Sequence, residues 1–226
     1  MKNKNVQYLD NIKNSVNELL DFYTDNHRKT LSIRFDVRYP QDYTGDTSSK
    51  NISDCMAHMV KKYKRRKCDP YYIWVREQNK SDHPHYHCLF LLDGTRVKTY
   101  NHVFKSVETI WNSTLDIDRD SKGLIDYCTN KSNRDYNGKM ITRTSDVEKF
   151  DSRLDEVKQQ ALYLAKAYTK GPLYDGQRNF GMSRLPKTKS VFGNFSFYSY
   201  KKACGQKKTV RGSKNSRRLS NGTPAI

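Results

Sequence analysis

Residues 69–92 read DPYYIWVREQNKSDHPHYHCLFLL, and this stretch predicts the centre of the fold. Two apolar runs, DPYYIWVREQ (69–78) and HYHCLFLL (85–92), have the composition of β-strands, and the polar segment NKSDHP between them is typical of a hairpin loop. The second run is apolar on both faces after His87. A strand of that kind lies in the middle of a sheet that is covered on both sides.

Helices and further strands are predicted on either side of this hairpin. Apolar residues at helical spacing predict helices over residues 6–24, 52–67, 101–114 and 145–171, and alternating or short apolar runs predict strands over 29–40, 123–128 and 138–143. Ser145 is the expected N-cap of the last helix, and Gly171 is its expected stop signal. The order of elements indicates an α+β domain on a mainly antiparallel sheet of about five strands, flanked by helices.

The C-terminal part of the chain differs from the rest in composition. No acidic residue follows Asp175, and residues 199–226 are basic, rich in Ser and Gly, and nearly devoid of apolar side chains. Such a segment cannot bury enough apolar surface to fold. We therefore expect one domain over residues 1–198 and a basic disordered tail over residues 199–226.

The charge of the chain indicates a polyanionic partner. There are 42 Lys and Arg residues against 24 Asp and Glu, which gives a net charge of +18 and a pI near 9.6. Such an excess suits nucleic acid or an anionic membrane surface. No run approaches the roughly 18 apolar residues of a membrane-spanning helix, so nucleic acid is the favoured partner and no membrane is expected.

Two features of the sequence indicate a cytoplasmic protein. The first residues, MKNKNVQYLD, lack the apolar core of a secretion signal. The five cysteines are scattered and form no CxxC pair, which argues against both a disulfide scaffold and a structural zinc ribbon.

Three of the six histidines fall within residues 83–87, and two of them are candidate metal ligands. His85 and His87 are two apart on a predicted strand, so their side chains project from the same face. If the hairpin turns around residue 81, Glu77 lies opposite His85 and supplies a third ligand, with Asp82 as the substitute. Two nitrogens and a carboxylate suit Mg²⁺ or Mn²⁺ acting as a Lewis acid on a phosphate. The alternative is a loop that is merely rich in histidine.

The last predicted helix contains a candidate nucleophile, Tyr163, with Lys166 three residues later and Lys170 on the same face. A phenol ionises near pH 10, so Tyr163 needs a neighbouring ammonium group and a polarised phosphate to react at neutral pH. Tyr168 lies five residues further on, about 140° around a helix, and cannot easily act at the same point. Taken alone, the Tyr-x-x-Lys pattern is weak, and both tyrosines suit ordinary structural roles.

The combination of these motifs resembles the HUH endonuclease superfamily. An acid before a hairpin, His-hydrophobic-His on the next strand and Tyr-x-x-Lys on a later helix extend over roughly residues 30–170, and KTLSIRFDVRYP is similar to the usual first strand. The segment YDGQRNFGMSRLP within residues 174–186 resembles the ending of filamentous-phage (inovirus) gene-two-type rolling-circle replication initiators and their prophage relatives.

This resemblance implies a site-specific endonuclease and ligase for single-stranded DNA. His85 and His87 would bind the metal, with Glu77 as third ligand, and Tyr163 would form a 5′-phosphotyrosine while Lys166 assists. Initiators with two catalytic tyrosines place them four residues apart, and the spacing of five here favours a single catalytic tyrosine. The expected substrate is single-stranded or hairpin origin DNA in a bacterial host. The chain has no GxxxxGK[ST] motif, so a host helicase and polymerase are expected partners.

Two groups of basic residues are predicted to contact DNA. The first is the run KKYKRRK, and the second lies in the last helix and the tail; the residues are Lys61, Lys62, Lys64, Arg65, Arg66, Lys170, Lys201 and Lys202. A solvated helix end is the ordinary interpretation of the first run.

Two other functions fit the same residues. One is a non-catalytic DNA-binding regulator in which the histidines are structural. The other is a zinc hydrolase that uses His83, His85 and His87.

Overall fold

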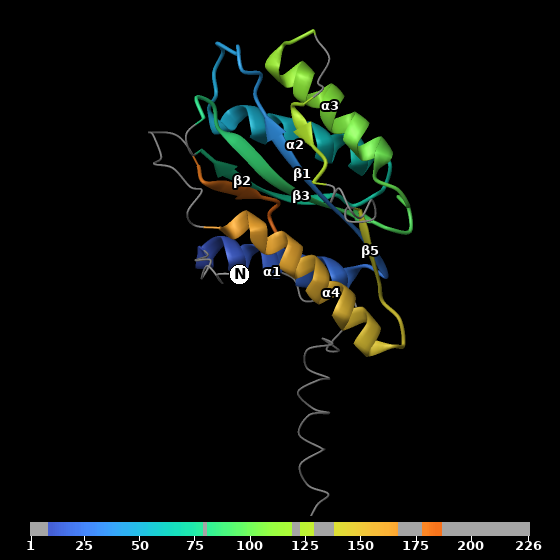
Figure 1. Ribbon diagram of the computed structural model, residues 1–226. Helices are drawn as coiled ribbons and strands as arrows, with labels where there is room; N and C mark the ends of the chain where they lie inside the picture. Colours follow the sequence, from blue (N-terminus) through green and yellow to red (C-terminus); the bar gives the residue numbers. More distant parts are fainter. Residues whose placement is uncertain (1–8, 79–80, 119–122, 129–137, 167–177, 187–226) are drawn as a thin grey trace, which may run out of the picture. The chain divides into compact units, whose positions relative to one another are not determined.

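The predicted hairpin lies at the centre of the sheet in the computed structural model of the protein (Figure 1). The structure describes residues 9–78, 81–118, 123–128, 138–166 and 178–186, which all belong to one compact unit, Met1–Thr188. The predicted tail, Lys170, Gly171, Lys201, Lys202 and Tyr168 lie outside the described residues. Among the described residues, no helix is both long and apolar enough to cross a membrane.

The sheet is antiparallel throughout its described pairings and contains six strands. The strands are β1 (Lys29–Arg38), β2 (Tyr71–Glu77), β3 (His85–Asp93), β4 (Ile125–Asp126), β5 (Lys139–Thr142) and β6 (Phe180–Met182). Their order is β4-β1-β3-β2-β6, with β5 also paired to β1. The predicted α+β class is therefore confirmed, and β3 is flanked by the two longest other strands.

Helices cover both faces of the sheet (Figure 1). These helices are α1 (Asp10–Asn26), α2 (Ser49–Arg65), α3 (Asn101–Leu115) and α4 (Val147–Ala161). Cys88 and Phe90 of β3 pack in a core with α2 and α3, whereas Leu89 and Leu91 pack in a second core with α1 and α4. Alternate side chains of one strand thus enter two cores, which explains why the run after His87 is apolar at every position.

The register of the hairpin agrees with the prediction from its loop. Glu77 pairs with His85, and Val75 pairs with His87, so the turn is centred on residue 81. A slip of one residue would turn Val75 and Ile73 out of the core that contains Leu89. Burial of that apolar face fixes the register, and the register places Glu77 beside the histidines.

The last helix is shorter than predicted and begins at a different cap. The side chain of Asp146, not Ser145, accepts a hydrogen bond from the Lys149 N–H at 3.0 Å, so the predicted Ser145 cap is wrong. At its other end α4 stops at Ala161 and the chain tightens into a 3₁₀-helix, η2 (Leu162–Ala165), instead of continuing to residue 171.

Packing against α1 explains the early end of α4. Leu164 and Ala165 are fully buried, and the Ala165 carbonyl accepts a hydrogen bond from the Leu9 N–H at 2.8 Å. Lys166 then has an extended backbone, with ψ of 123°. A continuing α-helix would rotate Leu164 and Ala165 to other positions, so the tertiary contact overrides the helical pattern.

Strand β6 is not among the predicted strands. It lies within the segment 174–186, and it pairs with the outer edge of β2. Gly181 lies against Trp74, where a Cβ atom would come within 2.7 Å of the indole ring. This glycine allows β6 to approach the sheet closely. The short strand then covers the edge of β2, which would otherwise be open.

Candidate metal centre and nucleophile

Glu77, His85 and His87 form a group that can hold a metal ion. One ligand atom from each lies within 4.8 Å of the other two. The Nε2 atom of His85 is 3.5 Å from Oε2 of Glu77, and Nε2 of His87 contacts the same oxygen. Glu77 is the last residue of β2, and His85 and His87 are the first and third residues of the paired strand β3, so the sheet itself holds them in place. The structure thus brings together all three predicted ligands.

The charges in this group favour the ionised carboxylate. Burial alone would raise the pKa of Glu77, but the contacts with His85 and His87 outweigh it and lower the pKa well below its usual range. For His87, burial alone would lower the pKa, but the contacts of the ring with Asp36 and Glu77 outweigh burial and raise the pKa. Glu77 is thus in the charged form that a metal ligand needs, and a bound cation would take the place of the proton on His87.

Asp36 of β1 completes the surroundings of His87, and the sequence did not predict it. Asp36 pairs with His87 across the sheet, and its Oδ1 lies 2.8 Å from Nδ1 of that ring. The contact is a close ion pair rather than a well-aligned hydrogen bond. Burial raises the pKa of Asp36, but His87 more than compensates and the pKa is lowered. A carboxylate behind the second ring nitrogen fixes the orientation of a ligating histidine.

Tyr163 packs directly against this group. Its ring meets the ring of His87 edge to face, with the centroids 5.1 Å apart. Nζ of Lys166 lies 3.7 Å from the centre of the Tyr163 ring, so the two predicted residues are together. They meet through η2 and the extended turn at Lys166, not along one face of an α-helix.

Arg34 is a second cation at Tyr163 that the sequence did not predict. Its Cζ lies 4.2 Å from the centre of the Tyr163 ring, and its Nη2 lies 3.7 Å from Oδ1 of Asp36. Arg34 and Asp36 are two apart on β1 and therefore share the face on which His87 lies. One signal in the sequence could have predicted both residues, namely the alternation of polar and apolar side chains in SIRFDV. A central strand with charged side chains on one face has a polar site on that face.

The donor set fits a divalent metal ion. Two imidazole nitrogens and a carboxylate oxygen leave open positions for water or substrate, as in catalytic metal sites. Asp82, the substitute ligand, is exposed and does not belong to the group, because Glu77 occupies the third place. His83 lies against Tyr39 and Tyr43 outside the strand, so the three-histidine arrangement of a zinc hydrolase does not form.

The predicted basic run of α2 lies away from this group. Cys68, just beyond α2, accepts a hydrogen bond from the Asp93 N–H at the end of β3 opposite to His85. The nine residues of β3 span roughly 26 Å. Moreover, α2 packs on the other face of the sheet. Lys61, Lys62, Lys64, Arg65 and Arg66 thus do not line the metal group, and their contact with DNA stays a prediction.

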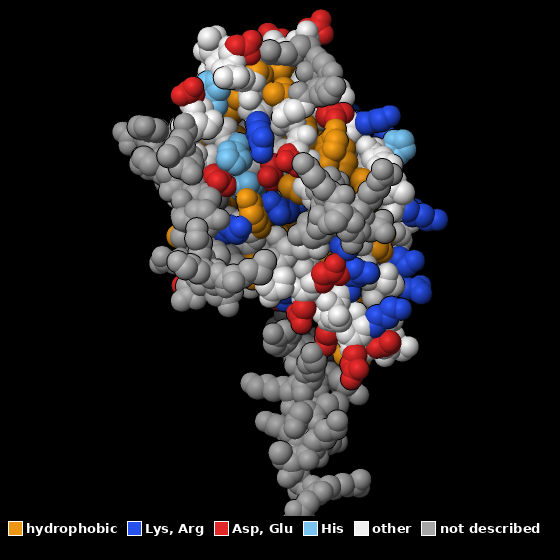
Figure 2. All heavy atoms as spheres, in the orientation of Figure 1, with side chains coloured by type: hydrophobic (Ala, Val, Ile, Leu, Met, Phe, Trp, Pro, Cys, Tyr) orange, Lys and Arg blue, Asp and Glu red, His pale blue; other side chains and the backbone are white. Residues whose placement is uncertain are grey.

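Figure 2 shows one face of the molecule, on which histidine side chains lie beside both acidic and basic side chains. Comparison with curated proteins and with solved structures finds no match. Comparison with protein families finds one: the model described as YagK/YfjJ C-terminal domain matches residues 2–183, a range that includes every described strand and helix. This family consists of prophage-associated proteins. The chain belongs to the YagK/YfjJ C-terminal domain family.

Proposed function

We propose that this protein is a metal-dependent endonuclease and ligase that nicks and rejoins single-stranded DNA through a 5′-phosphotyrosine on Tyr163. The observation that carries the proposal is the position of Tyr163, whose ring packs on His87 of the metal-binding group with two cations over its faces. A buried structural tyrosine needs no such surroundings. Neighbouring cations and a metal-binding group are the surroundings that can activate a nucleophile for a phosphodiester.

The metal-binding group would act on the phosphate. When bound by Glu77, His85 and His87, Mg²⁺ or Mn²⁺ would supply Lewis-acid stabilisation of the charge on the phosphate oxygens. The protein contributes rigidity, because two ligands come from β3 and one from its partner strand β2. Asp36 keeps the His87 ring turned toward Glu77.

The chemical step is an exchange of ester bonds. The Tyr163 hydroxyl loses its proton to solvent, and its oxygen attacks phosphorus. The bond between phosphorus and the 3′ oxygen breaks, and that oxygen takes a proton to become a free 3′-OH. The fragment on the 3′ side of the nick is then joined to Tyr163 through its 5′-phosphate. Attack by a 3′-OH on this ester reverses the step and rejoins the strand.

Arg34 and Lys166 would assist by their charge. Each lies close to the Tyr163 ring, Arg34 at 4.2 Å and Lys166 at 3.7 Å from the ring centre. Two cations at that distance favour the phenolate over the phenol, and they also balance charge that develops on the phosphate.

The biological role that this chemistry fits is initiation of rolling-circle replication for a phage or prophage-like element in the cytoplasm of a bacterial host. The prophage association of the family supports such a source. The free 3′-OH would prime a host polymerase, and a host helicase would separate the strands. The net charge of +18 supports DNA as the partner.

Covalent capture of DNA tests the proposal. The protein is incubated with Mn²⁺ and a pool of labelled single-stranded oligonucleotides, and adducts are resolved on a denaturing gel. We expect a labelled protein band with the wild type and none with Tyr163→Phe. Tyr71→Phe is the matched control, because Tyr71 lies at the end of β2 opposite to Glu77.

The metal requirement is tested in the same assay. The combined change His85→Ala and His87→Ala should abolish the adduct, as should a chelator. An adduct that persists in the Tyr163→Phe variant would overturn the assignment of the nucleophile. DNA binding without any adduct in the wild type would favour the non-catalytic regulator instead.

A further inference from the structure

A pocket of about 480 Å³ adjoins the metal group, and we propose that it binds one nucleobase of the DNA strand next to the phosphate that is cleaved. The inference rests on the proposed function and names a recognition site for it. The pocket lies between residues 38–41, which continue from β1, and the loop 81–85 that leads into β3. Its size is that of sites that enclose small organic ligands.

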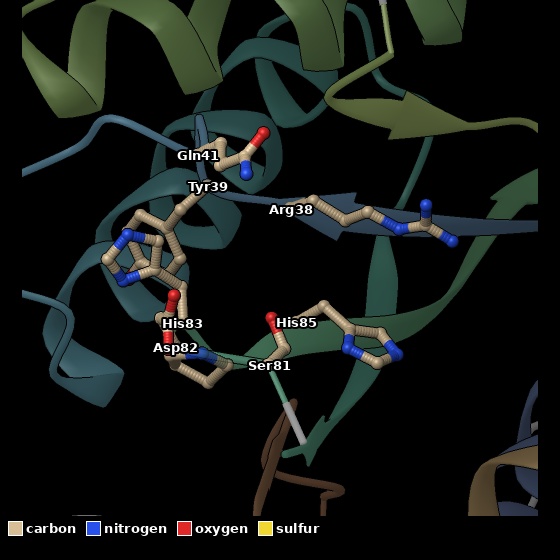
Figure 3. A pocket seen from close by; sticks show the side chains of 8 residues that line it. Arg38, Tyr39, Gln41, Ser81, Asp82, His83 and His85 are labelled. Atoms are coloured by element: carbon tan, nitrogen blue, oxygen red, sulfur yellow. The ribbon is translucent and has the colours of Figure 1, made fainter. Parts of the chain in front are cut away.

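His85 connects the pocket to the metal group, because it belongs to both. Figure 3 shows the ring of His85 and the side chain of Arg38 on one side of the pocket. The guanidinium of Arg38 is half exposed and lies 3.9 Å from an equally exposed carboxylate of Asp126. This ion pair is weak, because it is long and lies at the surface. Arg38 can therefore bind a phosphate beside the metal-binding group. A nucleotide in the pocket would have its phosphate on this side.

Aromatic rings form the other side of the pocket. Figure 3 shows the rings of Tyr39 and His83 together there, and their centroids are 6.0 Å apart. Tyr39 is buried and packs on Trp111, with centroids 5.2 Å apart, so this wall is fixed by the core. His83 is only partly buried and presents its ring to the pocket. A flat ring on a rigid support is the usual surface on which a base stacks.

Gln41 and Asp82 supply hydrogen-bonding groups between these two sides. Both are exposed pocket residues, and the described part of the chain offers neither side chain a hydrogen-bond or ion-pair partner. A carboxylate only accepts hydrogen bonds, whereas the Gln amide both donates and accepts. This pair suits a base with an exocyclic amino group, namely adenine, cytosine or guanine. Thymine has no such group and is the disfavoured base.

Base-substituted oligonucleotides test the pocket in two ways. The first measures equilibrium binding without metal, and the second measures adduct formation with Mn²⁺. Each uses strands that carry A, C, G, T or an abasic site at successive positions. For the wild type we expect about tenfold discrimination against thymine and the abasic site at a single position, which lies next to the cleaved phosphate in the second assay.

Variants of the pocket should remove this discrimination without a general loss of binding. Gln41→Ala and Asp82→Asn should bind strands with any of the four bases at that position equally. His83→Ala should bind a strand that carries the preferred base at that position as weakly as the strand with the abasic site there. Gln159→Ala and His58→Ala are matched controls at exposed positions of α4 and α2, and they should retain the wild-type preference.

The two assays separate this inference from the proposed function. A binding preference that depends on Gln41, Asp82 and His83 supports the pocket even if no adduct forms, in which case only the catalytic proposal fails. A wild-type preference that persists in all three variants overturns the pocket, as does uniform binding by the wild type. A loss of affinity in the variants that is the same whichever position of the strand is substituted also overturns the pocket.

Discussion

At the scale of single residues, Asp36 shows how one side chain on a neighbouring strand can complete a site. It lies behind His87, opposite to Glu77, and holds the ring between two carboxylates. Residues in this position tune ligands without binding the metal themselves. Its position depends on the pairing of β1 with β3, which joins residues that are far apart in the sequence.

The change Asp36→Asn should weaken metal binding. The amide keeps the shape of the side chain but loses the charge that orients the His87 ring, and such changes lower metal affinity about 10- to 100-fold. Titration calorimetry with Mn²⁺ measures the effect. Asp155→Asn, at an exposed position of α4, is the control and should bind Mn²⁺ like the wild type. Equal affinities for both variants would contradict the role given to Asp36.

His27 makes the stability of the protein depend on pH. Its Nδ1 lies 3.0 Å from the Tyr23 carbonyl, and its Nε2 lies 3.0 Å from Oδ2 of Asp69. Burial lowers the pKa of His27, but these two acceptors outweigh burial and raise it. The contribution of the imidazolium is therefore fully present below the unfolded-state pKa and is lost as pH rises through the raised pKa of the folded state.

The variant His27→Gln should consequently lose more stability in acid than in base. We expect a loss of about 1 kcal/mol near pH 5.5, since the group is a cation at the end of α1 and its partner Asp69 is half exposed. The loss should be smaller near pH 9. Urea unfolding at both pH values measures it. The same loss at both would show that the charge of His27 is unimportant.

At the scale of elements, the start of α4 provides a direct test of the described cap. Asp146 accepts the Lys149 N–H, whereas Ser145 makes no cap contact with α4. Asp146→Ala should therefore cost about 1 kcal/mol of unfolding free energy, and Ser145→Ala should cost close to nothing. Thermal or urea unfolding compares the two. A larger loss of unfolding free energy for Ser145→Ala than for Asp146→Ala would show that Ser145 is the N-cap, as the sequence predicted.

The elements also show which features a sequence can predict. The hairpin with its register was predictable, because alternation of apolar residues fixes which side chains share a face, and Glu77 and His85 followed from it. The end of α4 was not predictable, because burial of Leu164 and Ala165 against α1 decides it. Strand β6 was missed because three residues without apolar alternation give no periodic signal.

At the scale of the whole molecule, the candidate site is a product of the strand order. Glu77 comes from β2, the histidines from β3 and Asp36 with Arg34 from β1, and these three strands are neighbours in the sheet. Tyr163 comes from η2, seventy residues after the last residue of β3 in the sequence, and packs on His87. Sequence motifs predicted four of these positions. Arg34 and Asp36 required knowledge of which strand lies beside β3.

The charge of the whole chain should govern how DNA binding depends on salt. Lys and Arg side chains gather along one edge of the face in Figure 2, and residues 199–226 add eight more basic residues without an acid. Each phosphate contact to a single strand adds about 0.7 to the slope of log affinity against log salt. Deletion of residues 199–226 should therefore reduce that slope by up to about 6, in proportion to the number of phosphates that the tail neutralises.

Fluorescence anisotropy of a labelled single strand over a series of KCl concentrations measures this slope. A full-length variant with the eight basic residues replaced by Gln is the control, and it should match the deletion. Adduct formation at low salt should survive in both variants. An unchanged slope would mean that the tail does not contact DNA.

The most direct test of the central claim is to identify the residue that carries the DNA. After reaction with Mn²⁺ and single-stranded DNA, the adduct is digested with nuclease and trypsin and analysed by mass spectrometry. Cleavage after Lys158 and Lys166 yields the peptide QQALYLAK, in which Tyr163 is the one tyrosine, whereas Tyr168 falls in the next peptide, AYTK. The account predicts a nucleotide joined through its 5′-phosphate to Tyr163 in QQALYLAK. A nucleotide on AYTK or on any other peptide, or no adduct at all, would contradict it.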